Sequence, residues 1–287
     1  MMDNTLSMAT KKSPTARLMA YPLVRIVLGM VLTFAAVPLV MGIASQLVAK
    51  PYRILWPQLL AAVLVWCGYR FYVRRIEKRQ PLELALPGMG RELGRGLLLG
   101  AGLVVFTFVV LAVLGVYQIS GVNALGVVLL LPLAELVLVG MAEEMMFRGI
   151  LFGVTARALG SKAAIVISSL VFALAHLPND GFSLLAIVAI AAYGVLQAAL
   201  YMRTRRLWVC IGTHVGWNYC VSQVFSSTVS GHAATDGLLR GELVGKAMLT
   251  GGAFGVEASL VTVLLISAVA AWVLRLAFAS EARSPRN

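Results

Sequence analysis

Charged residues and cysteines are both scarce in this sequence. Only 13% of its 287 residues are charged, whereas 60% are hydrophobic, and the mean hydropathy is +0.89. No water-soluble domain needs that much apolar surface, so the soluble globular classes are excluded and a polytopic membrane protein is predicted. The three cysteines lie in apolar stretches and form no CxxC pair, which argues against a disulfide framework and a zinc knuckle.

Targeting signals and internal repeats are also lacking. The first residues have no apolar core or cleavage site of a signal peptide, and the last residues carry no lipidation motif. We expect residues 1–20 to be a basic cytoplasmic tail, residues 21–280 to be a single membrane domain, and residues 281–287 to be a C-terminal tail.

Positive charge is plentiful by comparison, with a net charge of +12. The lysines and arginines lie in short connections between apolar stretches, which is typical of cytoplasmic loops, so no nucleic-acid partner is expected. With both termini in the cytoplasm, the inner side collects most of these residues. The opposite side then receives only Lys50, Arg53, Arg240 and Lys246.

Eight apolar stretches predict an all-α fold, a polytopic bundle of about eight transmembrane helices. Most are close to the ~20 residues that cross a bilayer. They cover 24–48, 54–73, 97–117, 124–156, 162–178, 183–202, 207–226 and 257–279. The fourth is too long for one straight helix, and we expect Pro132 to break or kink it. The protein is therefore expected to be a multi-pass protein in a lipid bilayer, in the plasma or inner membrane if its source is bacterial.

Two connecting segments predict short helices outside the bundle. Residues 79–95 mix leucine with charge and predict an interfacial helix with a turn at its Pro-Gly pair. Residues 227–256 form the one long external loop, in which Thr235 and Asp236 predict a short amphipathic helix that runs through Met248.

Two pairs of glycines have the small-xxx-small spacing. They are Gly96 with Gly100, and Gly149 with Gly153. This spacing indicates close packing of helices rather than dimerisation.

The polar residues inside the apolar stretches fall into three short patterns, EEMMFR, FALAH and HVGWN. Their members are Glu143, Glu144, Arg148, Phe172, His176, His214 and Asn218. Each ionised group near the bilayer centre costs roughly 2.5–3.5 kcal/mol on insertion scales. Because mutual hydrogen bonds relieve that cost, a clustered, buried polar active site is predicted. Glu135 is a further acid in the same stretch as EEMMFR, and it has no predicted role.

The three patterns reach nearly the same depth in the membrane. Glu143 and His176 each lie fourteen residues from the basic inner end of their stretches, which corresponds to ~21 Å, and Asn218 lies at ~18 Å. Glu144 and Arg148 are four residues apart, so they share a helix face and can form an ion pair.

Such a set has a definite chemistry. A glutamate in a low-dielectric cavity suits general base catalysis, and a neighbouring histidine can hold a water. A histidine and an asparagine one turn apart are donors aimed at a common point, as an oxyanion requires. Hydrolysis of a peptide bond fits best. Glu143, His176 and His214 could instead form a His₂Glu zinc site, but the asparagine beside His214 favours a donor pair, so no cofactor is favoured.

The patterns match EExxxR, FxxxH and HxxxN, in that order. The chain in this respect resembles the CPBP family of CAAX prenyl protease type II-like intramembrane endopeptidases, also called the Abi family, over about residues 123–222. The resemblance implies that Glu143 and His176 activate the hydrolytic water and that His214 and Asn218 form the oxyanion hole. It also implies that Glu144 supports the site, together with Arg148 and Phe172. Members carry the name metalloprotease, and a metal-free glutamate mechanism is the alternative.

The implied substrate is a membrane-anchored protein or peptide, which could be prenylated at a CAAX terminus and would enter sideways or from the cytoplasm. Two other functions stay open. Intramembrane acids and histidines also occur in proton-coupled transporters, although neither repeats nor matching broken helices are present. A non-catalytic binding or immunity protein could keep the same fold.

Overall fold

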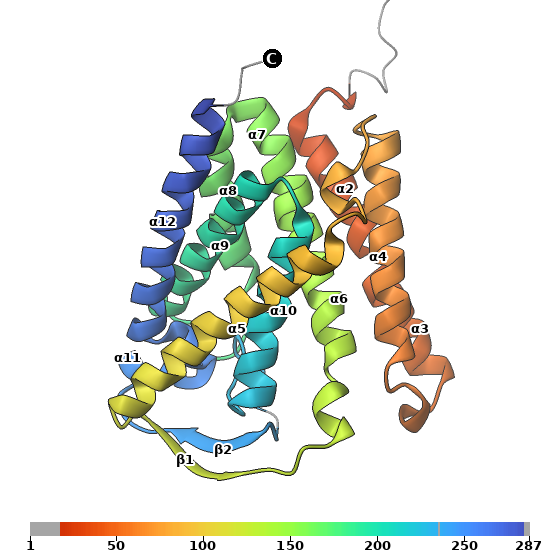
Figure 1. Ribbon diagram of the computed structural model, residues 1–287. Helices are drawn as coiled ribbons and strands as arrows, with labels where there is room; N and C mark the ends of the chain where they lie inside the picture. Colours follow the sequence, from red (N-terminus) through yellow and green to blue (C-terminus); the bar gives the residue numbers. More distant parts are fainter. Residues whose placement is uncertain (1–17, 235, 284–287) are drawn as a thin grey trace, which may run out of the picture.

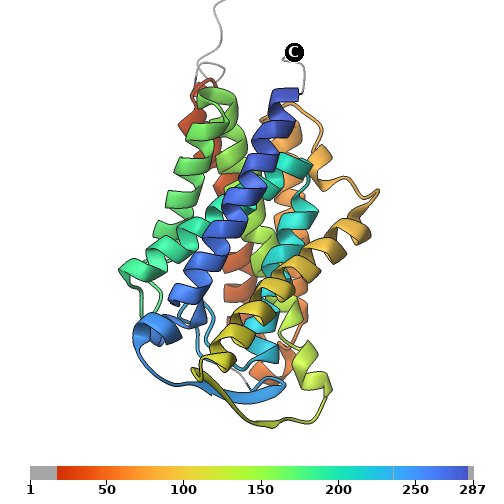
Figure 2. The same ribbon diagram turned by 60° about the vertical axis from the view of Figure 1, so that its left-hand side comes forward.

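The computed structural model describes residues 18–234 and 236–283, so most of the predicted N-terminal tail lies outside the described residues. The described chain is mostly helical. Its helices pack into one bundle, and the start of α2 and the end of α12 lie at the same end (Figures 1 and 2). We call this the terminal end. The opposite end carries the two strands, and we call it the strand end.

The helices follow one another along the chain, and the longest connections lie between α5 and α6 and between α10 and α11. They are α2 (Pro22–Phe34), α3 (Ala36–Leu47), α4 (Trp56–Arg75), α5 (Met89–Val113), α6 (Leu133–Glu144), α7 (Gly153–Leu159), α8 (Ser161–Ala175), α9 (Leu184–Thr204), α10 (Leu207–Tyr219), α11 (Ala247–Thr250) and α12 (Leu260–Arg283). Two π-helical segments, Met145–Phe152 and Cys220–Val224, continue α6 and α10. Short 3₁₀ turns lie at Lys50–Tyr52, Leu82–Leu84, Val127–Leu130, Gly252–Phe254 and Val256–Ala258.

Four helical stretches are long and apolar enough to cross a membrane. Among the described residues they are Pro22–Leu47, Met89–Val113, Leu184–Thr204 and Leu260–Arg283. Helices also occupy the other four predicted ranges, but these do not meet the same criterion of length and hydropathy. The helical class is thus confirmed, and the number of eight membrane crossings stays a prediction.

The fourth predicted range, 124–156, is not one helix with a kink. Pro132 lies immediately before α6, and the residues ahead of it form only the 3₁₀ turn Val127–Leu130. Proline starts this helix because its fixed φ suits a first turn, where its missing N–H is not needed. The prediction of a break at Pro132 holds, but the helix that carries the glutamates begins there.

The two helices predicted in the connections are not present as predicted, although the turn at Pro87-Gly88 is, and Thr235 lies outside the described residues. Residues 79–95 contain a 3₁₀ turn and then the start of α5, which follows Gly88 with its positive φ of 82°. In the long loop, residues 239–243 form strand β2 (Leu239–Leu243), and the helix α11 covers only 247–250. Strand β2 pairs antiparallel with β1 (Tyr117–Val122), so this long-range partner overrides the local helical pattern.

Helices α5 and α10 pack closely through glycines. A Cβ on Gly96 would collide with the carbonyl oxygen of Val209, and a Cβ on Gly100 would collide with that of Thr213. This confirms the prediction of close helix packing at the first glycine pair, and it fixes the position of the helix that carries HVGWN. At the second pair, Gly149 faces the ring of Tyr69.

Replacing Gly100 with alanine is expected to lower the free energy of unfolding by about 1–3 kcal/mol, because the new methyl group meets backbone atoms that cannot move aside. The matched control is Gly102→Ala in the same helix, where a Cβ meets nothing within 4 Å. There the change should be neutral or stabilising by about 0.4–1 kcal/mol. Unfolding in detergent measures both, and equal stability of the two variants would contradict the packing.

The start of α10 is fastened by Arg206. Its guanidinium donates to Glu92 at 2.8 Å and to the carbonyl oxygens of Leu82, Ala85 and Pro87 at 3.0, 2.5 and 2.8 Å. These bonds tie α10 to the connection before α5 at the terminal end. The depth at which α10 presents its polar residues is therefore set from that end.

Candidate active site

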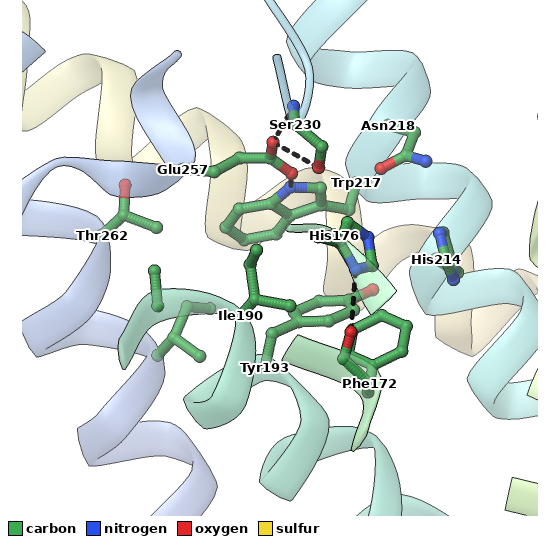
Figure 3. A pocket seen from close by; sticks show the side chains of 12 residues that line it. Phe172, His176, Ile190, Tyr193, His214, Trp217, Asn218, Ser230, Glu257 and Thr262 are labelled. Atoms are coloured by element: carbon green, nitrogen blue, oxygen red, sulfur yellow. Dashed lines mark hydrogen bonds between the residues drawn. The ribbon is translucent and has the colours of Figure 1, made fainter. Parts of the chain in front are cut away.

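Two of the three sequence patterns, FALAH and HVGWN, line one pocket between α8, α9, α10 and α12 (Figure 3), and the glutamates of EEMMFR contact it through His214. It encloses about 420 Å³ of empty space, part of which is open to the outside. Its lining residues are Phe172, His176, Ala189, Ile190, Tyr193, His214, Trp217, Asn218, Ser230, Glu257, Thr262 and Ile266. Three of the four predicted catalytic residues are among them, and the fourth, Glu143, does not line the pocket but has its Oε2 3.8 Å from the Nε2 of His214.

His176 is not inside a helix, as the predicted range 162–178 would require. Helix α8 ends at Ala175, and His176 is its C-cap. Its ring nitrogen Nδ1 lies 2.8 Å from the carbonyl oxygen of Phe172. A carbonyl only accepts, so Nδ1 carries the proton, and the Nε2 of a neutral ring is left as an acceptor.

Phe172 connects two of the patterns. Its ring is buried, with the guanidinium carbon of Arg148 4.4 Å from the ring centre and the His176 ring 4.8 Å away, edge to face. An aromatic face attracts a cation at this distance, most strongly where water is excluded. The phenylalanine of FALAH thus orients both the arginine of EEMMFR and the histidine four residues later.

Glu144 is the centre of the hydrogen-bond network. It is fully buried, and its Oε1 receives bonds of 3.1 Å from Arg148, 3.0 Å from Gln197 and 2.9 Å from His214. The ion pair expected from the i, i+4 spacing is therefore present. Because the carboxylate accepts from all three groups, it joins α6, α9 and α10 and holds the imidazole of His214 by its Nδ1.

Glu143 points to the other side of the same imidazole. Its Oε2 lies 3.8 Å from the Nε2 of His214, which is too long for a direct hydrogen bond. That oxygen is buried and has no hydrogen-bond partner among the described residues, while the side chain as a whole is 25% exposed. A buried acceptor of this kind is a place for a water molecule.

His214 lies between the two carboxylates. Because its Nδ1 bonds to Glu144, its Nε2 can donate a hydrogen bond only when the ring carries a second proton. Asn218, one turn further along α10, lines the pocket beside it (Figure 3). The amide of Asn218 and the Nε2 of His214 therefore belong to the same wall, as their spacing of four residues predicts.

Two residues of α9 were not identified from the sequence. Gln197 is completely buried and donates to Glu144 and, at 3.0 Å, to the carbonyl oxygen of Cys210. Tyr193 lies edge to face with His214, with ring centres 6.0 Å apart. Gln197 is a polar residue in an apolar stretch, so the criterion that selected the three patterns could also have selected it.

The outer part of the pocket involves two further residues that the sequence did not indicate. Glu257, just before α12, accepts a hydrogen bond of 2.8 Å from the indole of Trp217. It also accepts from the backbone N–H and, at 2.8 Å, from the hydroxyl of Ser230. Glu135, in contrast, lies exposed in the first turn of α6.

The arrangement does not fit the His₂Glu zinc site that the sequence left open. Among the described residues, no three histidine, cysteine or acidic side chains gather closely enough to hold a metal ion. The distance between the candidate ligands is the argument against zinc, and the bonds at the Nδ1 of His214 and His176 are not, because zinc-ligating histidines also donate their other N–H to a carboxylate or a carbonyl oxygen. No step is therefore derived through a metal.

The comparisons with known proteins agree with the three patterns. Residues 124–220 match the family model of the type II CAAX prenyl endopeptidase Rce1-like proteins. None of the curated proteins compared with the chain matches it. The matched segment contains α6, α8, α9, α10 and every residue of the predicted catalytic set. Over this segment, which is about a third of the chain, the protein is similar to the Rce1-like family of type II CAAX prenyl endopeptidases.

Proposed function

We propose that this protein is an intramembrane endopeptidase that hydrolyses a peptide bond of a membrane-anchored protein or peptide by a metal-free, glutamate-type mechanism. The observation that carries the proposal is that His176, His214 and Asn218 line one pocket, and that the Oε2 of Glu143, which has no hydrogen-bond partner among the described residues, lies 3.8 Å from the Nε2 of His214. A base, a water site and a pair of donors are the parts that amide hydrolysis needs.

Water activation falls to Glu143 and His176. The Oε2 of Glu143 has no hydrogen-bond partner in the described part of the chain, and the Nε2 of His176 is the acceptor of a neutral ring whose Nδ1 donates to Phe172. A water that donates one hydrogen to each directs a lone pair away from them, towards a substrate carbonyl in the pocket. As the oxygen–carbon bond forms, a water proton moves to the base, and the same group later returns it to the leaving amine.

Charge stabilisation falls to His214 and Asn218. The carbonyl oxygen becomes an oxyanion in the tetrahedral intermediate, and the amide N–H of Asn218 and the Nε2–H of a doubly protonated His214 would donate to it. Glu144, fixed by Arg148, holds the Nδ1–H of that ring and so aims its Nε2 at the pocket. This division gives the two adjacent glutamates different tasks, one as base and one as support.

The topology is proposed to be eight membrane crossings with both termini in the cytoplasm. The ends of the described chain share the terminal end of the bundle, where Arg157, Arg203 and Arg205 also lie, and excess positive charge favours the cytoplasm. The pocket wall includes Ser230 and Glu257, which belong to the connections at the strand end. We therefore favour sideways entry of the substrate over the cytoplasmic entry that the sequence also allowed.

The test is proteolysis by the purified protein in liposomes. A peptide with a lipid or prenyl anchor should be cleaved, and the same peptide without its anchor should be cleaved at least about tenfold more slowly, because the anchor raises the local concentration at the membrane. Absence of cleavage together with peptide binding would support the binding protein, and proton flux without cleavage would support the transporter. Loss of activity on chelation, restored by zinc, would overturn the metal-free mechanism.

A further inference from the structure

The outer wall of the pocket, defined by Trp217 and Ser230, is held together by one carboxylate. Glu257 divides its two oxygens between them: Oε1 accepts from the indole N–H of Trp217, and Oε2 accepts from the N–H and hydroxyl of Ser230 (Figure 3). Trp217 lies on α10, whereas Ser230 lies in the loop that follows the π-helical segment Cys220–Val224. The carboxylate thus joins two neighbouring elements of the pocket wall.

We propose that Glu257 is a positioning residue that fastens Trp217 to the 228–231 segment and so forms the mouth through which substrate reaches His176, His214 and Asn218. That the pocket admits a substrate rests on the proposed function, whereas the hydrogen bonds of Glu257 do not. All three donors to Glu257 are neutral groups, so its contribution here is to place them rather than to pair a charge.

The 228–231 segment has anchors that do not involve Glu257. The side-chain amide of Asn179 donates to the carbonyl oxygen of Ser230 at 2.8 Å, and the N–H of Gly231 donates to that of Phe254 at 2.9 Å. Gly231, with a φ of 82°, also lies directly on the backbone of Asp180. Loss of Glu257 should therefore release the segment from Trp217 without unfolding it.

The hydrogen bond to Glu257 fixes the position of the Trp217 indole in the pocket wall. Its ring lies 5.5 Å from that of Tyr193, and it precedes Asn218 in the sequence. The backbone of α10 is fixed independently by the glycine contacts with α5, so Asn218 stays in place when the indole moves. A loosened wall should then weaken substrate binding and leave the chemical step nearly intact.

The first experiment is a kinetic double-mutant cycle with Glu257→Gln and Trp217→Phe. Glutamine replaces one acceptor oxygen with a donor, so one side of the bridge is lost, and phenylalanine removes the indole N–H. Each variant should raise KM by about tenfold, the scale of one hydrogen bond to a charged group, with kcat within about threefold. The double variant should be no worse than either single one, because either substitution alone already breaks the bridge between Trp217 and Ser230.

The matched control is Glu281→Gln, the same change near the far end of α12, where the carboxylate accepts from Ser161 at 2.6 Å. It should leave KM unchanged. The proposal is overturned if the control raises KM equally, if the effects of the two pocket substitutions multiply, or if Glu257→Gln lowers kcat at constant KM.

A second experiment does not need proteolysis. Ala189 lines the pocket and is 5% exposed, so Ala189→Cys, with the exposed Cys67 replaced by serine, reports on access through the mouth. Adding Glu257→Gln should speed labelling by a water-soluble thiol reagent about tenfold. An unchanged rate overturns the proposal even if the wild-type protein cleaves nothing, whereas faster labelling without any cleavage upholds it and refutes the proposed function alone.

Discussion

Replacing Glu143 with glutamine is expected to lower kcat for the anchored peptide by about 10²–10⁴-fold, the range that a general base contributes. The amide keeps the size of the side chain but cannot take a proton from water. Its Oε2 position has no protein partner to lose among the described residues, so folding should be little affected. Cleavage rate in liposomes and unfolding in detergent measure the two effects separately.

The control for this prediction is Glu135→Gln. Glu135 belongs to the same helix but lies exposed in its first turn, two turns before the site. The Glu135→Gln variant should cleave the anchored peptide at the wild-type rate. If Glu143→Gln retained full activity, or if both variants lost it together, the proposed base would be wrong.

Glu143 and Glu144 have different partners, and only part of this difference can be predicted from the sequence. Successive residues of a helix point about 100° apart, so their neighbours were expected to differ. The structure adds which neighbour each one has. Glu144 faces Arg148, Gln197 and the Nδ1 of His214, whereas Glu143 faces only the Nε2 of that ring. The spacing of residues predicts in which direction a side chain points around its own helix axis. It does not predict which other helix lies in that direction.

The depth of the three patterns was the most informative property of the sequence. Counting residues from the basic helix ends predicts nearly one depth for Glu143, His176 and Asn218 and places His214 one turn shallower. His176, His214 and Asn218 line one pocket, whereas Glu143 does not. Counting assumes an uninterrupted α-helix, however. Helix α8 stops one residue before His176, and the segment with Arg148 is π-helical. π-Helical turns are common at functional sites, and no periodicity in the sequence indicates them.

The residues that sequence reasoning missed are those whose partners are far along the chain. Gln197 meets a glutamate 53 positions earlier, and Glu257 meets a tryptophan 40 positions earlier. Spacing rules relate residues within one turn of a helix and say nothing about such pairs. The same limit explains strand β2, which needs β1 more than a hundred residues earlier as its partner.

Replacing Arg148 with alanine is expected to lower the free energy of unfolding by about 3–5 kcal/mol, because it leaves the buried carboxylate of Glu144 without its counter-ion. Both side chains are almost fully buried, with exposed fractions of 1% and 0%. The guanidinium also contacts the carbonyl oxygen of Gly194 and the ring of Phe172, so three helices lose an anchor. Cleavage should disappear as well. The measurements are unfolding in detergent and the rate of peptide cleavage.

A double variant distinguishes the effect of the buried Glu144–Arg148 ion pair on stability from its effect on activity. Arg148→Met combined with Glu144→Gln removes both charges and keeps the volume, and such replacements of a buried ion pair are often neutral for stability. Stability should therefore recover to within about 1–2 kcal/mol of wild type, whereas cleavage should not, because His214 has lost the carboxylate that holds its Nδ1–H. The exposed Arg205, whose side chain is 63% accessible, is the matched control, and its replacement by alanine should change stability by less than about 1 kcal/mol. Recovery of full activity in the double variant would mean that this ion pair only supports the fold and that the proposed role of Glu144 in aiming His214 is wrong.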